Sequence, residues 1–221
     1  MSIVFRNIHK SFGPKQVLRG VDFTVEEGEC FFIIGTSGAG KSVMIKHLIG
    51  LLRPDEGDIF LAGREVSRLT ETEFYPIRME CAMVFQNSTL FDSMTCEENV
   101  ALPLRLHKGL TMDKALEEAG RRLGQVHMER FAKAFPAELG DGMRKRVAIA
   151  RALTLDPKYV LFDEPTTSLD PVSARRVDEM IRELCDKVGV TAIVVSHDLV
   201  SIFSIADRIA MLYKGQLRLL G

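Results

Sequence analysis

The glycine-rich run from Gly35 to Ser42 has the pattern GxxxxGK[ST], which is typical of loops that bind phosphate groups. It follows the apolar stretch Cys30–Ile34, which predicts a buried strand, and precedes Val43–Ile49, which predicts a helix. Its glycines let backbone N–H groups crowd around anionic oxygens, and the N-terminus of the next helix favours negative charge. The run therefore predicts a nucleoside triphosphate site. The residues of this phosphate loop are Gly35, Thr36, Ser37, Gly38, Ala39, Gly40, Lys41 and Ser42.

The last two residues of the loop carry the side chains that would act on the phosphates. The Lys41 ammonium is expected to reach the outer phosphates, and the Ser42 hydroxyl is expected to ligate Mg²⁺. A glycine-rich turn without a ligand is the alternative interpretation, and the strand–loop–helix context argues against it. The loop thus implies nucleoside triphosphate chemistry with Mg²⁺ as a cofactor.

Two adjacent carboxylates, Asp163 and Glu164, follow the apolar run Val160–Phe162. Open α/β sheets bind their ligands at the carboxyl ends of the strands, where these two acids are expected to lie. Asp163 would hold Mg²⁺ through water, and Glu164 would polarise the water that attacks the γ-phosphate. Taken alone, a strand that ends in Asp-Glu-Pro is ordinary turn chemistry, so this assignment depends on the phosphate loop upstream.

The apolar patterns along the chain predict an α/β protein. Ile3–His9 and Gln16–Val25 alternate apolar and polar residues, which predicts strands of a half-exposed antiparallel sheet. Cys81–Phe85, Tyr159–Phe162 and Thr191–Val195 are almost uninterrupted apolar runs, as expected in parallel strands that are covered on both faces. The core is therefore expected to be a parallel sheet.

Helices are expected in two parts of the chain. From about residue 87 to 157 the pattern is helical, and Thr95 with Glu98 forms a capping-box signal. Between the last two core strands, Asp170 is expected to cap a helix that has Pro171 at its first position. The buried stripe of this later helix is expected to comprise Val177, Met180, Ile181 and Leu184.

The composition shows no strong bias. The 221 residues include 29 basic and 30 acidic ones, so the net charge of −1 gives no reason to expect a nucleic-acid partner. The four cysteines are scattered without metal-ligand spacing, which indicates buried thiols in a reducing cytosol. There is no signal-peptide pattern, and no apolar run approaches the ~18–20 residues that would span a bilayer. Any work at a membrane is therefore expected to need another subunit.

Besides the phosphate loop and the acid pair, further short motifs follow one another in a fixed order. They are Gln86, Leu139–Met143, Arg144–Leu153, Ser168–Asp170 and Ser196–Asp198. Over essentially the whole chain, this order resembles that of the nucleotide-binding subunits of ABC transporters; each motif is weak singly, and together they are highly specific. The resemblance implies an α/β fold in a single domain over residues 1–221. That domain would be a P-loop NTPase with a RecA-like core, an N-terminal antiparallel β subdomain and an α-helical subdomain inserted at roughly 87–157.

The resemblance also implies an activity, partners and a location. Such subunits hydrolyse ATP, with Mg²⁺, and couple the hydrolysis to transport. They work as head-to-tail homodimers that sandwich two ATP molecules, and they attach to integral-membrane permease subunits. The protein is accordingly expected at the cytoplasmic face of the inner membrane, held there through a permease.

Several residues acquire roles only through their positions in this pattern. Phe12 corresponds to the aromatic residue that stacks on adenine, with an ordinary core phenylalanine as the alternative. Gln86 corresponds to the glutamine that touches Mg²⁺ and the attacking water and that links ATP to the membrane partner. His197 corresponds to the histidine that contacts the γ-phosphate, and Asp170 to the aspartate that crosses the dimer interface. The expected catalytic residues are Glu164, His197 and Gln86. The expected Mg²⁺ ligands are Ser42, Gln86 and Asp163.

One motif departs from the family pattern. Where the family has Leu-Ser-Gly-Gly-Gln, this chain has Leu139, Gly140, Asp141, Gly142 and Met143, which we call the signature segment. Gly140 lacks the serine hydroxyl, whose hydrogen bond to a charged phosphate would be worth about 1.5–3 kcal/mol. Asp141 adds a carboxylate where the partner's γ-phosphate must dock, a repulsion of roughly 3 kcal/mol at ~5 Å and an effective dielectric of about 20. Asp141 is also expected to cap the helix that follows. ATP binding is expected to survive, while dimerisation and hydrolysis are impaired.

The segment after Gln86 indicates the kind of transporter, because the family contacts its permease there. Val84–Thr95 and Glu98–Arg105 resemble the ATPases of the Mla/Mce systems, which move phospholipids or other lipids between bacterial membranes. Cell-division ATPases with an FtsX-type partner and lipoprotein-release ATPases are alternatives, because they share the string Asn-Val-Ala-Leu-Pro-Leu. A nucleotide switch or regulatory protein, impaired in hydrolysis by its signature segment, is an alternative of another class.

Overall fold

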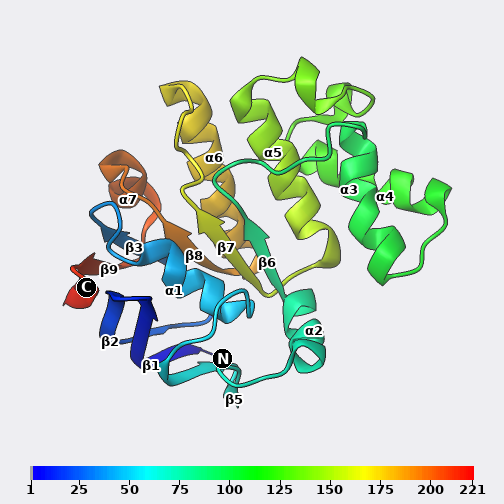
Figure 1. Cartoon of the computed structure of the whole chain (residues 1–221). Helices are drawn as coiled ribbons and strands as arrows, with labels where there is room; N and C mark the ends of the chain where they lie inside the picture. The colour runs from blue at the N-terminus through cyan, green and yellow to red at the C-terminus, as the bar shows by residue number, and fades with distance from the viewer. Residues whose placement is uncertain (1) are drawn as a thin grey trace.

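A six-stranded sheet forms the centre of the protein, whose computed structural model describes residues 2–221. Its strands lie in the order β10-β9-β3-β8-β7-β6, and all neighbours are parallel except β9 and β10 (Figure 1). They are β3 (Cys30–Gly35), β6 (Cys81–Val84), β7 (Tyr159–Asp163), β8 (Thr191–Val195), β9 (Arg208–Tyr213) and β10 (Gln216–Leu220). The apolar strands β7 and β8 are buried at every residue, as the predicted parallel arrangement requires.

A second sheet is built from antiparallel strands of the N-terminal part of the chain. Its order is β2-β1-β4-β5, where β1 is Ile3–Phe12, β2 is Lys15–Val25, β4 is Glu56–Leu61 and β5 is Arg64–Glu65. The alternation seen in the sequence reflects burial, because Ile3, Phe5 and Ile8 of β1 point into the core. The predicted N-terminal antiparallel sheet is thereby confirmed.

Helices cover both faces of the parallel sheet. Helix α1 (Lys41–Leu48) lies between the two sheets, where Met44 and Ile45 share one buried cluster with residues of both (Figure 1). The opposite face is covered by α6 (Pro171–Glu183), the π-helical segment η4 (Leu184–Val188) and α7 (Leu199–Ile205). Helix α2 (Glu71–Glu80) leads directly into β6.

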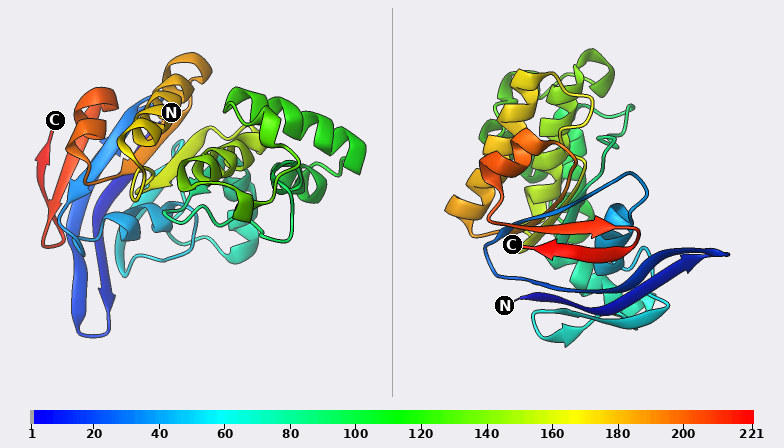
Figure 2. Two further views of the ribbon diagram at one scale, coloured as in Figure 1. Left: turned by 90° about the horizontal axis from the view of Figure 1, so that it is seen from above. Right: turned by 90° about the vertical axis from the view of Figure 1, so that its left-hand side faces the viewer.

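Further helices lie at the far end of the molecule from β1 and β2 (Figure 2). They are α3 (Cys96–His107), α4 (Met112–Gln125) and α5 (Asp141–Ala152), with the short 3₁₀ segments η1 (Glu129–Phe131), η2 (Pro136–Glu138) and η3 (Leu153–Leu155). The predicted capping box of Thr95 and Glu98 begins α3. Helix α5 belongs to two layers, because Val147 is buried against α3 and α4 while Ile149 is buried against the parallel sheet. Within residues 2–221, no helix has the length and apolar character needed to cross a bilayer.

The predicted buried stripe of α6 is only partly correct. Val177 and Ile181 are fully buried in the core beneath the parallel sheet. Met180 and Leu184 pack against the same core but are only partly buried, because both also line an open cavity. The helical period thus predicted which side of α6 faces inward, but not how far the contact extends along it.

Candidate nucleotide-binding and catalytic site

The predicted functional residues come from one edge of the parallel sheet. Strand β3 runs into the phosphate loop, β7 ends at Asp163, and β8 ends two residues before His197. Because β3 pairs with β8 and β8 pairs with β7, all in parallel, these strand ends lie next to one another. This is the carboxyl edge, at which open α/β sheets bind their ligands.

The backbone of the phosphate loop requires glycine at two positions. Gly35 has φ 150°, and a Cβ atom there would lie 2.2 Å from the carbonyl oxygen of Leu212. Gly40 has φ 101°, and a Cβ atom there would lie 2.6 Å from Leu18 Cδ2. Helix α1 begins at the next residue, Lys41, so that its unpaired N-terminal N–H groups face the loop.

Ser42 and Asp163 meet across the site. The Ser42 hydroxyl donates to Asp163 Oδ1 at 2.6 Å, and the carboxylate is almost fully buried. Hydroxyl and carboxylate oxygens suit Mg²⁺, which commonly takes one or two carboxylates together with phosphate oxygens and water. This pair therefore fits a Mg²⁺ ion that arrives with a nucleotide. Nowhere in residues 2–221 do three or more His, Cys, Asp or Glu side chains form a cluster that could hold a metal by themselves.

The Lys41 ammonium lies at the centre of the site. It donates to the carbonyl oxygens of Gly35 at 2.9 Å and Thr36 at 3.3 Å, and it is 8% exposed. Its Nζ also lies 3.8 Å from Glu164 Oε1. Since the carbonyls are neutral and this carboxylate is not in close contact, the ammonium retains much of its capacity to bind phosphate oxygens.

Glu164 is held in an uncommon backbone conformation beside His197. Its φ is 51°, in the left-handed region, where a non-glycine residue costs of order 1–2 kcal/mol. Its N–H donates to the carbonyl of Val195 at 2.9 Å, which ties the residue to β8. His197 Nδ1 lies 2.7 Å from Glu164 Oε2, and Thr167 Oγ1 donates to the same oxygen at 3.2 Å. These contacts hold a carboxylate near Lys41 and the phosphate loop, as a catalytic base requires.

The other predicted site residues lie around this centre. Gln86 follows β6 and is exposed, and Phe12 at the end of β1 is 47% exposed, so it is not the core residue of the alternative interpretation. Lys10 Nζ lies 5.6 Å from the centroid of the Phe12 ring. Asp170 caps α6 as predicted, because its Oδ1 accepts from two backbone N–H groups, and Pro171 is the first helical residue.

A buried lysine beside Gln86 was missed by sequence reasoning. Lys145 of α5 is 2% exposed, and its Nζ donates to the carbonyl oxygens of Phe85 at 3.0 Å and Gln86 at 2.6 Å. Burial lowers the pKa of Lys145 to about 8, while the charges of Asp163 and Asp141 act in the opposite direction. The pattern of α5 gives no signal for this, since a helical lysine normally lies on the solvent face.

The signature segment begins α5 in a way that corrects one expectation. Gly140 is the N-cap, with φ −68° and ψ 163°, and Asp141 is the first helical residue. The prediction that Asp141 caps this helix is therefore wrong. Its carboxylate instead pairs with the guanidinium of Arg144, one turn later on the same helix. The other members of the segment are Leu139, which is buried, and Gly142 and Met143, which are partly buried.

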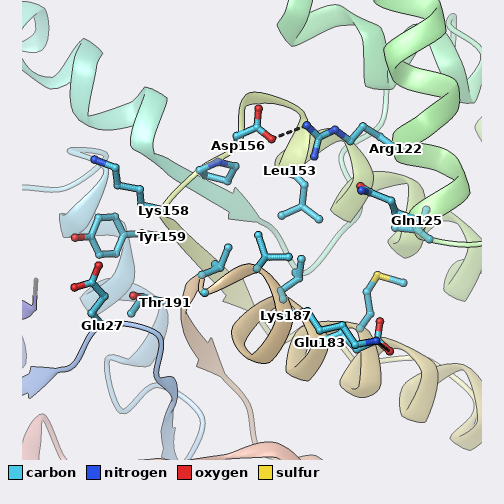
Figure 3. Close-up of a pocket in the computed structure, with 17 residues that line it drawn as sticks. Glu27, Arg122, Gln125, Leu153, Asp156, Lys158, Tyr159, Glu183, Lys187 and Thr191 are labelled. Atoms are coloured by element: carbon cyan, nitrogen blue, oxygen red, sulfur yellow. Dashed lines mark hydrogen bonds and ion pairs between the residues drawn. The ribbon is translucent and has the colours of Figure 1, made fainter.

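A cavity of about 530 Å³ lies at the other edge of the parallel sheet, where β7 and β8 begin (Figure 3). Figure 3 shows Arg122 and Asp156 paired on one side of it, with Lys158 and Tyr159 on another. Its lining comes from α4, α6, η4 and the segment before β7. The predicted site residues, all of which lie in the described part of the chain, do not line it. The residues predicted to bind the nucleotide therefore lie at the open carboxyl edge rather than in this cavity.

Comparisons with known proteins agree with this geometry. The family model described as ABC transporter matches residues 18–167. The chain is 39% identical to the methionine import ATP-binding protein MetN of Mesorhizobium japonicum over 211 residues, which cover 96% of this chain and 58% of MetN. It is 36% identical to the probable ribonucleotide transport ATP-binding protein mkl of Mycobacterium tuberculosis, over all of this chain and 62% of mkl. The chain thus spans about three fifths of the length of these curated relatives.

Solved structures resemble the whole of this chain. The dimeric post-hydrolysis state of the ATP-binding cassette MJ0796, bound to ADP and Pi, has a TM-score of 0.90 and 31% identity, over 99% of this chain and 97% of that one. A second dimeric structure of MJ0796, described as a bacterial ABC transporter cassette, has a TM-score of 0.91 with the same identity and coverage. Together with the family match and the phosphate-loop geometry, these findings show that the chain belongs to the ABC transporter family and forms one of its ATP-binding cassettes, which take ATP with Mg²⁺.

Proposed function

We propose that this chain is the ATP-hydrolysing subunit of an ABC transporter and works as a head-to-tail homodimer beneath a permease. The observation that carries the proposal is that three groups of side chains lie together at one edge of the parallel sheet. They are the Lys41 ammonium in the phosphate loop, the Ser42–Asp163 pair and the Glu164–His197 pair. A phosphate loop alone supports binding only. The carboxylate held beside it supports hydrolysis as well.

Each residue of the site has a proposed part in this chemistry. Glu164 polarises the attacking water at the outer end of the phosphates, a role supported by its distance of 3.8 Å from Lys41. His197 donates its Nδ1–H to Glu164 and presents the rest of its ring, which is exposed, to the γ-phosphate. Gln86 contacts Mg²⁺ and the attacking water. Phe12 stacks on adenine, which its exposure at the end of β1 permits.

The signature segment acts on the nucleotide of the other subunit in this proposal. Asp141 would bring a carboxylate toward the partner's γ-phosphate, and Gly140 would bring no hydroxyl donor. The Arg144 guanidinium that pairs with Asp141 neutralises part of this charge, so the repulsion is smaller than that of a lone carboxylate. We therefore propose a slow ATPase rather than an inactive one. Asp170, at the start of α6, faces the same interface.

Restoration of the family signature is expected to accelerate hydrolysis. The double variant Gly140→Ser/Asp141→Gly regains a hydroxyl donor and loses the carboxylate. The ATPase rate should rise about tenfold, which requires only about 1.4 kcal/mol of barrier. ATP affinity of the monomer should hardly change, because the segment acts on the other subunit's nucleotide. Phosphate release checks the rate, and titration of the monomeric protein with MgATP checks the affinity.

Single variants separate the two contributions. Asp141→Asn removes the charge and the ion pair with Arg144 but leaves the segment without a hydroxyl, whereas Gly140→Ser adds only the donor. The thermal midpoint should fall slightly in Asp141→Asn, since an acid in the first turn of a helix stabilises it by about 0.3–1 kcal/mol. An ATPase rate in the double variant that equals or falls below that of the wild type would show that Asp141 does not face the phosphate.

The segment after Gln86 has the features of a docking surface for the permease. The Phe91 ring is 50% exposed, although its backbone is fixed on both sides by Asn99. The Phe91 N–H donates to Asn99 Oδ1 at 2.8 Å, and Asn99 Nδ2 donates to the Phe91 carbonyl at 3.0 Å. The Arg151 guanidinium lies 6.0 Å from the ring centroid. An exposed aromatic residue on a rigid loop suits a protein interface.

Substitution of Leu90 and Phe91 by alanine is expected to weaken assembly with the permease. Co-purification from detergent should fall about tenfold, because an apolar anchor of an interface contributes more than about 1 kcal/mol. ATP affinity should not change, since neither side chain belongs to the phosphate site. Phe131→Ala, at a similarly exposed phenylalanine of η1, is the matched control. If the double variant co-purified with the permease as efficiently as the wild type, this segment would be excluded as the docking surface.

For the transported substrate, we propose lipid. The support is the likeness of residues 84–95 and 98–105 to lipid-transport ATPases. A second candidate is methionine, on the strength of the relatives named MetN. The permease that co-purifies should be reconstituted with this chain in proteoliposomes, and ATPase stimulation by phospholipid compared with stimulation by methionine. Stimulation by methionine alone would reject the lipid proposal, and a protein that binds no permease would favour a nucleotide switch.

A further inference from the structure

Two cations of α5 hold the chain segment that follows β6. Lys145 Nζ donates to the carbonyl oxygens of Phe85 and Gln86, at 3.0 and 2.6 Å. Arg151 Nη2 donates to the carbonyl oxygen of Thr89 at 3.0 Å and to its Oγ1 at 3.2 Å. Gln86 and Asn87 form a bend between the two contacts, and Thr89 has φ 49°, in the left-handed region. The path of the chain around Gln86 is therefore set by α5, not by the sheet alone.

The burial of Lys145 makes its contacts hard to exchange for others. Lys145 as a whole is 2% exposed, and two backbone carbonyls accept the hydrogen bonds of its ammonium. The negative charges of Asp163 and Asp141 favour the charged form of Lys145 and so raise its pKa, against the effect of burial. Loss of the ammonium would leave two partly buried carbonyls without their donor, which is unfavourable where water does not replace it.

The position of Lys145 joins two functional parts. Helix α5 begins with the signature segment, and Lys145 is one turn into that helix. Its acceptors are Gln86 itself and the residue before it. A shift of the N-terminus of α5 therefore pulls directly on the backbone of Gln86.

We infer that Lys145 is a positioning residue for Gln86, tethering its backbone to the signature helix so that the two move as one unit. The inference rests on the proposed function, because it takes Gln86 as the residue that contacts Mg²⁺ and the attacking water. A movement of the signature segment, which faces the partner's nucleotide, is thereby transmitted to the hydrolysis site of its own subunit.

The variants that test the tether are Lys145→Met, which keeps the length but removes the donors, and Lys145→Gln, which keeps N–H donors. In single-turnover assays with protein in excess over MgATP, Lys145→Met should hydrolyse about tenfold more slowly, with ATP affinity changed by less than about twofold. Lys145→Gln should recover most of the rate. Lys187→Met, at an exposed lysine of η4, is the control and should match the wild type.

A double-mutant cycle with Gln86→Ala separates positioning from general stability. If Lys145 acts through Gln86, Lys145→Met should cause little further loss in the Gln86→Ala background, whereas a merely structural role should cause the same loss there. Should Lys145→Met not fold, Lys145→Leu, which also lacks N–H donors, takes its place in the cycle under the same criterion.

The possible failures are distinguishable. A wild-type rate in Gln86→Ala would refute the proposed role of Gln86. A reduced rate in Gln86→Ala together with a wild-type rate in Lys145→Met, or equal losses in both backgrounds, would overturn the tether alone.

Discussion

MgATP binding is expected to disappear when Lys41 is replaced by alanine, with the dissociation constant rising at least about 100-fold, or roughly 2.7 kcal/mol. The ammonium is buried in the phosphate loop, and its contacts there are the neutral carbonyls of Gly35 and Thr36. It is therefore the principal positive charge available to the outer phosphates. Charge-assisted hydrogen bonds of this kind contribute about 1.5–3 kcal/mol each, and the ammonium can make more than one.

A lysine on the same helix is the matched control for this variant. Lys46 lies in the last turn of α1, away from the loop, and Lys46→Ala should bind MgATP as the wild type does. Isothermal titration calorimetry measures the MgATP affinity of the wild type and of both variants. Thermal unfolding shows whether Lys41→Ala remains folded. Equal affinity of Lys41→Ala and the wild type would exclude this loop as the nucleotide site.

Replacement of Glu164 by glutamine is expected to lower the hydrolysis rate at least about 100-fold while ATP remains bound. A positioned general base contributes about 10²–10⁴ to such a rate, and an amide cannot accept the proton of the attacking water. The glutamine oxygen can still accept the His197 Nδ1–H, whose nitrogen lies 2.7 Å from the carboxylate. The geometry should therefore survive, and only the base is lost.

The Glu164→Gln variant also makes the dimer observable. Because ATP is not consumed, the variant should accumulate an ATP-bound dimer, and more so with the signature segment restored. Sedimentation velocity with MgATP measures the fraction of dimer, and a separate assay measures phosphate release. Glu179→Gln, at an exposed acid of α6, is the control. Hydrolysis by Glu164→Gln at the wild-type rate would assign the base to another residue.

Those parts of the fold that rest on local patterns were predictable from the sequence. The strands of the parallel sheet are apolar runs, because both faces are buried, and their carboxyl ends must share an edge. Helix α2 was not predicted, although Thr70 and Glu73 form a capping box at its start. Pro76 inside this helix obscures the pattern, since proline removes a helical hydrogen bond.

The candidate site also has parts that the sequence predicts and parts that it does not. The phosphate loop and the acids after β7 are contiguous motifs, so their chemistry could be inferred before their geometry was known. The tether from Lys145 to Gln86 joins residues 59 positions apart, and no periodicity indicates it. The partner of Asp141 was missed for another reason. An acid near a helix start can cap the helix or pair along it, and only the backbone conformation of Gly140 decides between them.

A single-turnover experiment with γ-labelled ATP tests most directly whether this cassette binds and hydrolyses ATP at the carboxyl edge. Wild-type protein in excess is mixed with the nucleotide, with Mg²⁺ or with EDTA, and bound nucleotide and released phosphate are measured on the same samples. We predict that ATP binds and labelled phosphate appears with Mg²⁺, that EDTA prevents its release, and that Glu164→Gln retains uncleaved ATP. Failure of the wild type to retain ATP, or phosphate release that persists undiminished in Glu164→Gln, would contradict this assignment.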